Sequence, residues 1–374
     1  MVRLYSKVLY LLLLFPFLTS FTNPVNPDHK TLEIGAKAPD FNLEGTDRKR
    51  YTLKNFADSK LLAIIFTCNH CPTAQAYEDR IKELVTDYKN KGVAIVAISP
   101  NDASSVRLDE MGYTDMGDSK EEMKIRAKDK GFNFPYLYDG ENSEVSLKYG
   151  PVATPHVFIF DAERKLRYTG RIDNSEKPGT AKIHDTRNAL DALLAGKAVP
   201  VETTKTFGCS VKWPDKEEGV KKAFEQWAKE PVALNAINVN EVKNLLKNNS
   251  DTLRLINIWA TWCGPCVTEF PNFVTINRMY RGRDFELISI SADKPDKKSK
   301  ALAFLKSKQA SNKNYIYNAE NIYDLIEAVD KNWQGALPYT ILVAPGGKIV
   351  YSKQGTIDPL LMKKTIVQQL GRYY

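Results

Sequence analysis

Residues 253–271 read LRLINIWATWCGPCVTEFP, and this stretch decides the fold. An apolar run typical of a buried strand ends at Trp259, a Cys-Gly-Pro-Cys segment occupies residues 263–266, and a helical pattern continues to Arg278. The pattern therefore places two cysteines at the junction between a strand and a helix. Unpaired N–H groups and the positive end of the dipole at a helix N-terminus favour a thiolate over a thiol, so this placement predicts redox chemistry at sulfur.

The same plan occurs earlier in the chain. Leu61 to Phe66 is a strand-like run, Cys68-Asn69-His70-Cys71 follows it, and Ala74 to Tyr88 has a helical pattern. Further segments match at nearly the same offset, namely the apolar runs 93–99 and 285–291, and the Thr154-Pro155 and Leu337-Pro338 dipeptides. This drift is typical of a divergent tandem duplication. Strands that alternate with helices predict an α/β protein with two domains, each a central mixed β-sheet flanked by helices on both faces.

Length and charge agree with two soluble domains. A chain of 374 residues is too long for one ordinary core. We expect domains at residues 33–213 and 232–374, joined by a polar, lysine-rich linker at residues 214–231. The formal charge is +8, but the lysines are scattered rather than gathered into a stripe with aromatic residues, so no nucleic-acid partner is expected.

The first residues have the pattern of a secretory signal. Arg3 and Lys7 precede an apolar run from Val8 to Leu18, and small polar residues follow. We therefore expect a signal peptide at residues 1–22 and an exported, periplasmic protein. The run is about half the roughly 20 residues that a membrane-spanning helix needs, and a retained N-terminal anchor is the alternative.

The second cysteine pair carries a specific resemblance. The string NIWATWCGPCVTEFP, with Pro338 further along, resembles the thioredoxin superfamily and its exported TlpA/ResA-like branch over residues 232–374. The resemblance implies a thiol-disulfide oxidoreductase in which Cys263 is the exposed attacking thiolate and Cys266 resolves the mixed disulfide. It also implies that Pro338 is cis, which leaves the backbone of Leu337 free to bind an extended substrate chain beside Trp262.

Four residues near the second pair are candidates for tuning its reactivity. Gly264 and Pro265 are the dipeptide that tunes the pair, and Asn257 stands where cytosolic thioredoxins carry a buried acid. Glu269 matches the glutamate of TlpA/ResA-like sites, where a partly buried carboxylate can exchange a proton with Cys266. The alternative for Glu269 is an acid of the first helical turn that interacts only with the helix dipole.

The first pair resembles a different branch. Residues 33–213, with IGAKAPDFNL, CNHCPTAQAYEDR, ATPH and FGCSVKW, resemble the redoxin family that includes peroxiredoxin-like (AhpC/TSA-type) proteins. Cys71-Pro72-Thr73 aligns with the peroxidatic Cys-Pro-Thr of that family, which has Thr three residues and Pro seven residues before its cysteine. Cys68 and Ile64 stand at those positions. Dithiol exchange is therefore favoured over peroxide reduction.

Three residues around the first pair, His70, Cys209 and His156, have alternative roles. His70 either tunes the thiolate by charge or hydrogen bonding, or caps the helix or faces solvent. Cys209 is either a resolving partner or an inert buried thiol, and the inert interpretation is favoured. His156 either borders the site or lies on the surface. Thr154 and Pro155 correspond to Leu337 and Pro338 and are assigned to substrate binding.

The leading hypothesis is a thiol-disulfide oxidoreductase whose partners are disulfide-bearing or dithiol proteins and a membrane electron donor. The two pairs either relay electrons or act on separate substrates. No cofactor and no metal is expected, because the pairs lie roughly 190 residues apart, far beyond zinc-ribbon spacing. The alternatives are an antioxidant peroxidase at the first pair and a peptide-binding module with vestigial cysteines. The sequence does not indicate an oligomeric state.

Overall fold

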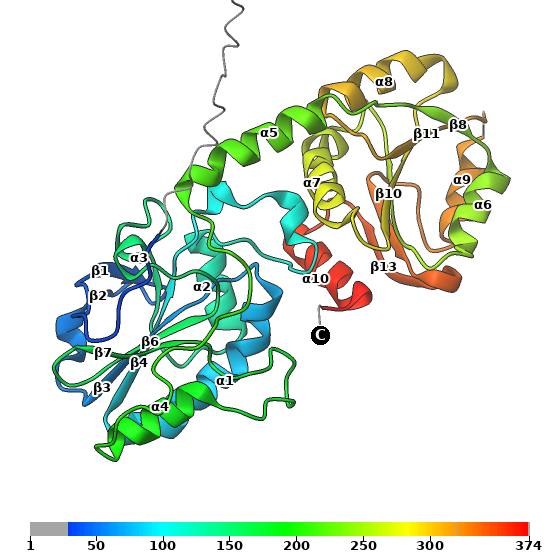
Figure 1. The fold of residues 1–374 in the computed structure, drawn as a ribbon. Coiled ribbons are helices and arrows are strands. Elements are labelled where there is room, and N and C mark those ends of the chain that lie inside the picture. The colour runs from blue at the N-terminus through cyan, green and yellow to red at the C-terminus, as the bar shows by residue number, and fades with distance from the viewer. Residues whose placement is uncertain (1–28, 320, 373–374) are drawn as a thin grey trace, which may run out of the picture.

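The computed structural model describes residues 29–319 and 321–372. Figure 1 shows two α/β bodies, the first domain with sheet strands β1–β7 and the second with β8–β13, and helix α5 (Glu217–Ala228) runs between them. The expected signal peptide at residues 1–22 lies outside the described residues. Within the described ranges, no helix has the length and apolar character needed to cross a membrane.

The first domain contains a seven-stranded mixed sheet in the order β2-β1-β5-β4-β3-β6-β7. Strand β3 is parallel to β4 and antiparallel to β6, which places it in the interior of the sheet. The strands are β1 (Asn42–Gly45), β2 (Arg50–Thr52), β3 (Leu61–Phe66), β4 (Val93–Ser99), β5 (Tyr136–Tyr138), β6 (His156–Phe160) and β7 (Leu166–Gly170). The helices are α1 (Pro72–Tyr88), α2 (Lys120–Asp129), α3 (Glu144–Tyr149) and α4 (Asp185–Leu194).

Helices cover both faces of this sheet. Alternate side chains of β3 point to opposite faces, so Ala63 and Ile65 join one core cluster while Ile64 and Phe66 join another. The first cluster includes side chains of α1, α2 and α4, and the second includes side chains of α3. Because β3 is buried on both faces, its sequence is continuously apolar rather than alternating.

The second domain repeats this plan with a six-stranded mixed sheet in the order β13-β12-β9-β10-β11-β8. The strands are β8 (Asn235–Ile237), β9 (Leu253–Trp259), β10 (Phe285–Ser291), β11 (Lys313–Tyr317), β12 (Tyr339–Val343) and β13 (Ile349–Gln354). The helices are α6 (Val239–Lys247), α7 (Gly264–Tyr280), α8 (Lys298–Ser307), α9 (Ile322–Val329) and α10 (Pro359–Leu370). One face packs against α7, α8 and α10, and the other against α6 and α9. The expected α/β fold with helices on both faces is confirmed in both domains.

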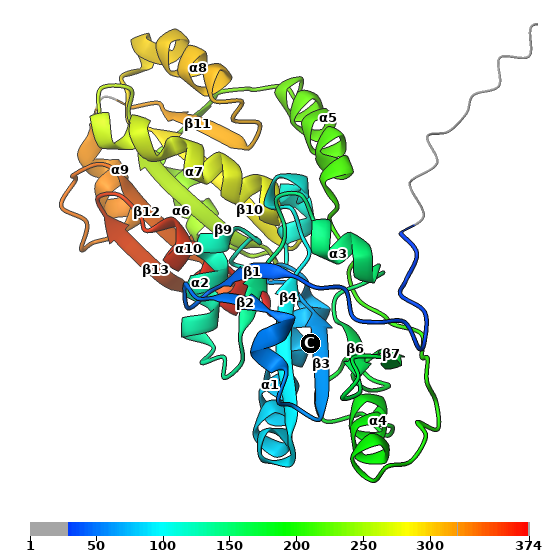
Figure 2. The ribbon, with the colours of Figure 1, turned by 90° about the vertical axis from the view of Figure 1, so that its left-hand side faces the viewer.

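The two domains contact each other beyond α5. The 3-10 helix Leu108–Met111 of the first domain packs against α7, and Met111 belongs to the same core cluster as Phe273 and Tyr280. The buried Tyr280 hydroxyl donates to the carbonyl oxygen of Thr114 at 2.8 Å. In Figure 2, α10 lies beside the first domain, and Lys364 of α10 pairs with Asp129.

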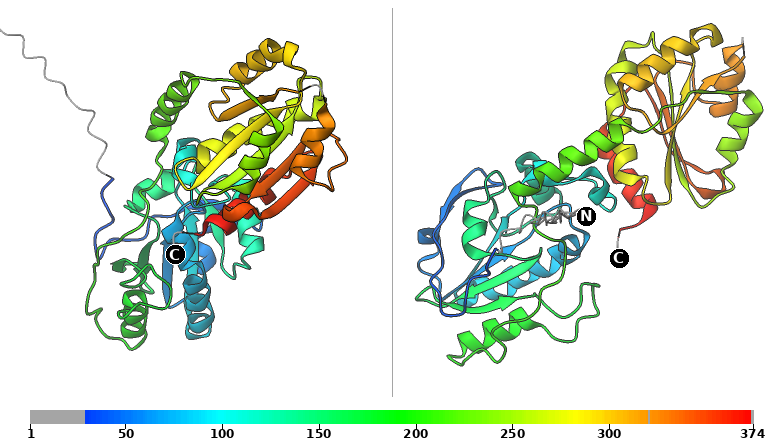
Figure 3. Two further views of the ribbon diagram at one scale, coloured as in Figure 1. Left: turned by 90° about the vertical axis from the view of Figure 1, so that its right-hand side faces the viewer. Right: turned by 45° about the horizontal axis from the view of Figure 1, so that its top comes forward.

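Helix α5 contributes to the same interface. Figure 3 shows it passing from one body to the other. Trp227 is buried and lies against the Arg278 guanidinium, 5.1 Å from its ring centroid, while Phe224 stays exposed. The expected linker thus contains a helix whose tryptophan is covered by the second domain.

We expect Tyr280→Phe to loosen the contact between the domains. The substitution keeps the ring but leaves the buried carbonyl of Thr114 without this donor, which costs about 1 kcal/mol. Thermal unfolding followed by calorimetry should show a lower midpoint and earlier separation of the two domain transitions. The control Tyr323→Phe alters an exposed tyrosine and should unfold as the unmodified chain does. If both variants unfold at the same midpoint and with the same separation of the two transitions, the hydrogen bond of Tyr280 has no role in holding the domains together.

Candidate redox sites

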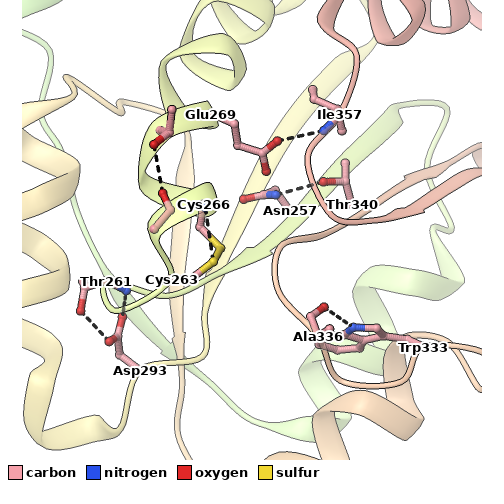
Figure 4. Close-up of a disulfide and its surroundings, with 12 residues drawn as sticks. Asn257, Thr261, Cys263, Cys266, Glu269, Asp293, Trp333, Ala336, Thr340 and Ile357 are labelled. Atoms are coloured by element: carbon pink, nitrogen blue, oxygen red, sulfur yellow. Dashed lines mark hydrogen bonds between the residues drawn. A yellow bond between two sulfur atoms is a disulfide. The ribbon is translucent and has the colours of Figure 1, made fainter.

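The second cysteine pair lies where strand β9 leads into helix α7. Cys263 is the N-cap residue of α7, and its sulfur accepts a hydrogen bond from the Cys266 backbone N–H at 3.3 Å. Cys263 and Cys266 form a disulfide with an S–S length of 2.04 Å (Figure 4). The helix N-terminus thus points its unpaired N–H groups at the first sulfur of the pair.

Both half-cystines are largely covered. Cys263 is 7% exposed and Cys266 is 1% exposed. Cys263 is therefore the more accessible sulfur, but the expectation of an exposed Cys263 is wrong for the disulfide form. The reason is that both residues belong to a core cluster with Trp259 and Phe270.

A surface suited to an extended polypeptide borders Cys263. The Leu337–Pro338 peptide bond is cis, as expected, and the backbone of Leu337 has no hydrogen-bond partner within the described ranges. Trp262 is 67% exposed. An apolar hollow of about 420 Å³ lies beside it, lined by Trp262, Tyr317, Ile322, Ile326, Trp333 and Leu337 among others. The free backbone and the hollow together offer main-chain pairing and an apolar subsite next to the disulfide.

Glu269 is a buried carboxyl on the inner face of α7, three residues after Cys266. One carboxylate oxygen accepts from the Ile357 backbone N–H at 2.9 Å (Figure 4), and the other is buried with no partner among the residues that the structure describes. Burial raises the pKa of Glu269 to about 7, although the hydrogen bond from Ile357 lowers it. Residues three apart on a helix are neighbours, so Glu269 lies next to Cys266 along α7.

The remaining tuning positions of the second pair have distinct surroundings. Asn257 is buried and donates to the Thr340 hydroxyl at 3.0 Å, so it is a neutral member of the core. Gly264 and Pro265 are the first two residues of α7. A Cβ at Gly264 would meet nothing within 4 Å, so the approach to the helix N-terminus is open there.

In the first domain, the helix begins at a different cysteine. Cys71, the second cysteine of its pair, is the N-cap residue of α1, and Pro72 is the first helical residue. The Cys71 sulfur accepts from the Ala74 backbone N–H at 3.4 Å. Cys68 lies outside the helix, with its sulfur 3.2 Å from the Thr154 hydroxyl. The sulfur at the helix N-terminus is therefore the second of the pair, whereas in the second domain it is the first.

A buried carboxylate organises the loop between these cysteines. Asp118 accepts hydrogen bonds from the backbone N–H groups of Asn69 and His70 at 2.8 and 3.0 Å. It also accepts from the Asn101 amide at 2.7 Å, and its second oxygen lies 2.5 Å from His70 Nδ1. Burial alone would lower the pKa of His70, but the charge and hydrogen bond of Asp118 raise it. His70 is 2% exposed, so the solvent-facing interpretation of this residue is wrong.

These surroundings separate the thiols of the first domain. Burial disfavours a thiolate at Cys71, but hydrogen bonds from the Cys209 and Cys68 thiols, the His70 charge and the Ala74 N–H hold the pKa of Cys71 well below its ordinary value. Burial, the hydrogen bond to Cys71 and the Asp118 charge raise the pKa of Cys68 well above it. The geometry thus favours Cys71 as the thiolate.

Thr154 and His156 flank the pair in unexpected ways. The Thr154–Pro155 bond is cis, but Thr154 is buried, its N–H donates to the Cys209 carbonyl, and its carbonyl oxygen lies 3.4 Å from the Cys71 sulfur. It contacts both cysteines and has no free backbone to offer a substrate. His156 is 2% exposed and bonded to the Val152 N–H and the Thr169 hydroxyl, so the surface interpretation is wrong. Burial lowers the pKa of His156 to about 3, which keeps it neutral.

Sequence reasoning missed Asp118. It lies 48 residues after His70 along the chain, between a 3-10 helix and α2. Its segment has no periodic pattern, and only the fold brings it under the cysteine loop. Donor atoms of Cys68, His70 and Asp118 lie within 4.8 Å of one another, a distance that suits a metal ion. However, Asp118 already takes part in the four hydrogen-bonding contacts described above, so its oxygens serve the loop.

A Cys-x-x-Cys pair at a strand-to-helix junction, with a cis-proline immediately before the neighbouring strand, defines a redox enzyme of the thioredoxin fold. The chain belongs to the Redoxin family, whose model matches residues 33–190 and 228–370.

Relatives fall into two groups. Alkyl hydroperoxide reductase E of Mycobacterium tuberculosis is 26% identical over 172 residues, which cover 44% of this chain and 97% of that protein. Thiol-disulfide oxidoreductase ResA of Bacillus subtilis is 28% identical over 102 residues, which cover 27% of this chain and 52% of that protein. A solved structure of a hypothetical protein from Sinorhizobium meliloti 1021 is 34% identical, with a TM-score of 0.43, and covers 49% of this chain and 96% of that one.

We expect Asp118→Asn to raise the pKa of Cys71. Without the carboxylate charge His70 becomes neutral, and the thiolate loses a favourable charge. In a chain carrying Cys263→Ser and Cys266→Ser, the ultraviolet absorbance of the thiolate should titrate at least about one pH unit higher in the variant. Asp109→Asn, which removes an acid that is 40% exposed, is the control and should titrate unchanged. An unchanged midpoint in correctly folded Asp118→Asn would contradict the role given to Asp118.

We expect Glu269→Gln to change the pH profile of disulfide reduction in the second domain. Glutamine keeps an oxygen for the Ile357 N–H but has no proton to give to a departing Cys266 thiolate. With a pKa of about 7, Glu269 carries that proton at lower pH and loses it as the pH rises. At fixed dithiothreitol thiolate concentration, the rate constant of the unmodified chain should fall as the pH rises, while the variant stays flat and is about tenfold slower in acid. Parallel profiles would show that Glu269 does not supply the proton; the expected alternative of a first-turn acid is already wrong, because Glu269 is the sixth residue of α7 and accepts from the Ile357 N–H.

Proposed function

We propose that this protein is an extracytoplasmic thiol-disulfide oxidoreductase that exchanges dithiols and disulfides with partner proteins. The observation that carries the proposal is the disulfide of Cys263 and Cys266 at the N-terminus of α7, next to the unpaired backbone of Leu337. A partner chain in extended conformation pairs with that backbone and brings its own sulfur to Cys263, while an apolar side chain of the partner enters the hollow beside Trp262.

Each step of the exchange has a residue to perform it. A partner thiolate attacks the Cys263 sulfur, the Cys263–Cys266 bond breaks, and Cys266 leaves as a thiolate that takes a proton from Glu269. A second partner thiolate then attacks the partner sulfur of the mixed disulfide, and Cys263 leaves as a thiolate stabilised by the helix N-terminus. The partner dithiol is oxidised and the Cys263–Cys266 disulfide is reduced, and the reverse sequence reduces a partner disulfide.

The proposed location and electron supply rest on the sequence. The basic residues and apolar run before residue 22 favour export, and an oxidised pair that must be reduced again outside the cytoplasm calls for a membrane electron donor. The first domain exchanges dithiols at Cys71, either with the second domain or with a separate partner.

A second candidate activity, peroxide reduction at Cys71, is favoured by one observation. Cys71 is a helix N-cap residue followed by Pro72, and the surrounding groups hold the pKa of its thiol low. A low pKa makes a thiolate available for attack on a peroxide oxygen. Against it stands Cys68 at the place of the threonine hydroxyl expected to orient peroxide. Hydroperoxide consumption that depends on Cys71 and matches the rate of disulfide exchange would favour this activity.

Reduction of insulin disulfides by dithiothreitol tests the main proposal. The full chain should accelerate it, Cys263→Ser/Cys266→Ser should fall to the uncatalysed rate, and Cys68→Ser/Cys71→Ser should keep most of the activity. Cys266→Ser alone should accumulate a mixed disulfide between Cys263 and an insulin chain, because the resolving thiol is missing.

The control Ser307→Ala, on the exposed side of α8, should behave as the unmodified chain. Full activity of Cys263→Ser/Cys266→Ser would contradict the assignment to the second pair. If a chain with every cysteine replaced by serine still allows its partner proteins to mature fully, the peptide-binding alternative is favoured.

A further inference from the structure

Cys209 lies directly against the buried pair of the first domain. Its backbone N–H donates to the Cys71 sulfur at 3.3 Å, and its side chain packs against the cluster of Cys68, Cys71 and Ala74. Its carbonyl accepts from the Thr154 N–H at 3.0 Å in an isolated β-bridge, which fixes its position beside the cis-proline loop. Hydrogen bonding to Cys71 and burial raise the pKa of Cys209, which favours its neutral thiol beside Cys71. Three sulfurs therefore form one centre around Cys71.

The three thiols differ in access. Cys71 is fully buried and Cys68 is 3% exposed, so a partner protein does not reach either in this arrangement. Cys209 is only half-buried. It lies in the segment 195–213, which contains isolated bridges but no helix and no longer strand, so the bridge to Thr154 is the regular pairing that holds its backbone. Cys209 is the sulfur of this centre that faces the outside.

We propose that Cys71 and Cys209 form a second redox disulfide in this protein, and that Cys209 is the sulfur that a dithiol partner attacks. This inference rests on the proposed function, because it concerns how the first domain exchanges disulfides with its partners. The sequence favoured an inert role for Cys209, and this inference replaces that expectation. The sequence could not show that the Cys209 backbone N–H lies against the Cys71 sulfur.

The chemistry of the centre suits this order of events. A partner thiolate attacks the outward Cys209 sulfur, the Cys71–Cys209 bond breaks, and Cys71 leaves as a thiolate that the Ala74 N–H and the His70 charge stabilise. The partner's second thiolate attacks its own sulfur in the mixed disulfide, and Cys209 leaves and takes up a proton. The partner dithiol loses two electrons and two protons, and the Cys71–Cys209 disulfide gains the two electrons.

Cys68 has a separate place in the centre. Its sulfur is within hydrogen-bonding distance of the Thr154 hydroxyl. Burial, the hydrogen bond to Cys71 and the Asp118 charge disfavour its thiolate, so Cys68 is a poor first nucleophile. When its proton is removed it attacks Cys71 in the Cys71–Cys209 disulfide, which moves the disulfide inward to Cys68–Cys71 and releases Cys209. The outward disulfide is the exchangeable form and the inward one is the stored form.

Disulfide mapping of the full chain tests the inference. In a Cys68→Ser/Cys263→Ser/Cys266→Ser chain only Cys71 and Cys209 remain, and one equivalent of diamide should remove both thiols without forming dimers. Mass spectrometry after non-reducing digestion should find the peptides of Cys71 and Cys209 joined. In the Cys263→Ser/Cys266→Ser chain, adding Cys209→Ala should slow reduction of the oxidised first domain by dithiothreitol at least about tenfold. Ser210→Ala is the matched control and should leave that rate unchanged.

The outcomes separate this inference from the proposed function. A Cys209→Ala chain that forms Cys68–Cys71 and is reduced at the control rate would overturn the inference and leave the insulin-reducing activity of Cys263 and Cys266 intact. A mixed disulfide of dithiothreitol with Cys71 rather than Cys209 would do the same. Loss of insulin reduction by the unmodified chain would instead overturn the proposed function.

Discussion

The contact between a helix N-terminus and one sulfur is the constraint on which both sites depend. In the second domain, α7 begins immediately after Cys263, so the first sulfur of the pair receives the helix N–H group. In the first domain, α1 begins immediately after Cys71, so the second sulfur receives it. Two pairs with identical spacing therefore present opposite ends to the helix, and the sulfur that is best stabilised as a thiolate differs between them.

The surroundings of each pair follow from this difference. In the second domain the stabilised sulfur is the outer one, next to an exposed tryptophan and a free backbone, and an unpaired oxygen of Glu269 serves the inner one. In the first domain the stabilised sulfur is the inner one, and the His70–Asp118 pair supports the loop around it. A buried thiolate exchanges disulfides with a partner only through a more accessible sulfur beside it. In the proposed reaction Cys209 is that sulfur, because it lies against Cys71. The second site is thus open to partner chains directly, while the first is reached through an intermediate sulfur.

Much of the fold was predictable because its central strands are continuously apolar. The runs 61–66, 93–99, 253–259 and 285–291 coincide with β3, β4, β9 and β10, since strands buried on both faces leave a local signal. The positions of both cysteine pairs followed from those strands. The start of the helix relative to each pair was not predictable, because Cys-Asn-His-Cys-Pro and Cys-Gly-Pro-Cys allow a start after either cysteine. Asp118 and Cys209 reach the first site from irregular segments, so only tertiary packing places them there.

The opposite polarity of the two pairs is tested most directly by NMR of the reduced chain with isotope-labelled cysteine, titrated with pH and assigned with single serine variants. Cβ chemical shifts report the thiolate without requiring access to reagents. Cys71 should be a thiolate at a pH where Cys68 and Cys209 are still thiols, and in the second domain Cys263 should ionise before Cys266. Ionisation of Cys68 before Cys71 would contradict this order, because the helix N-terminus and the His70–Asp118 pair would then not determine which sulfur reacts.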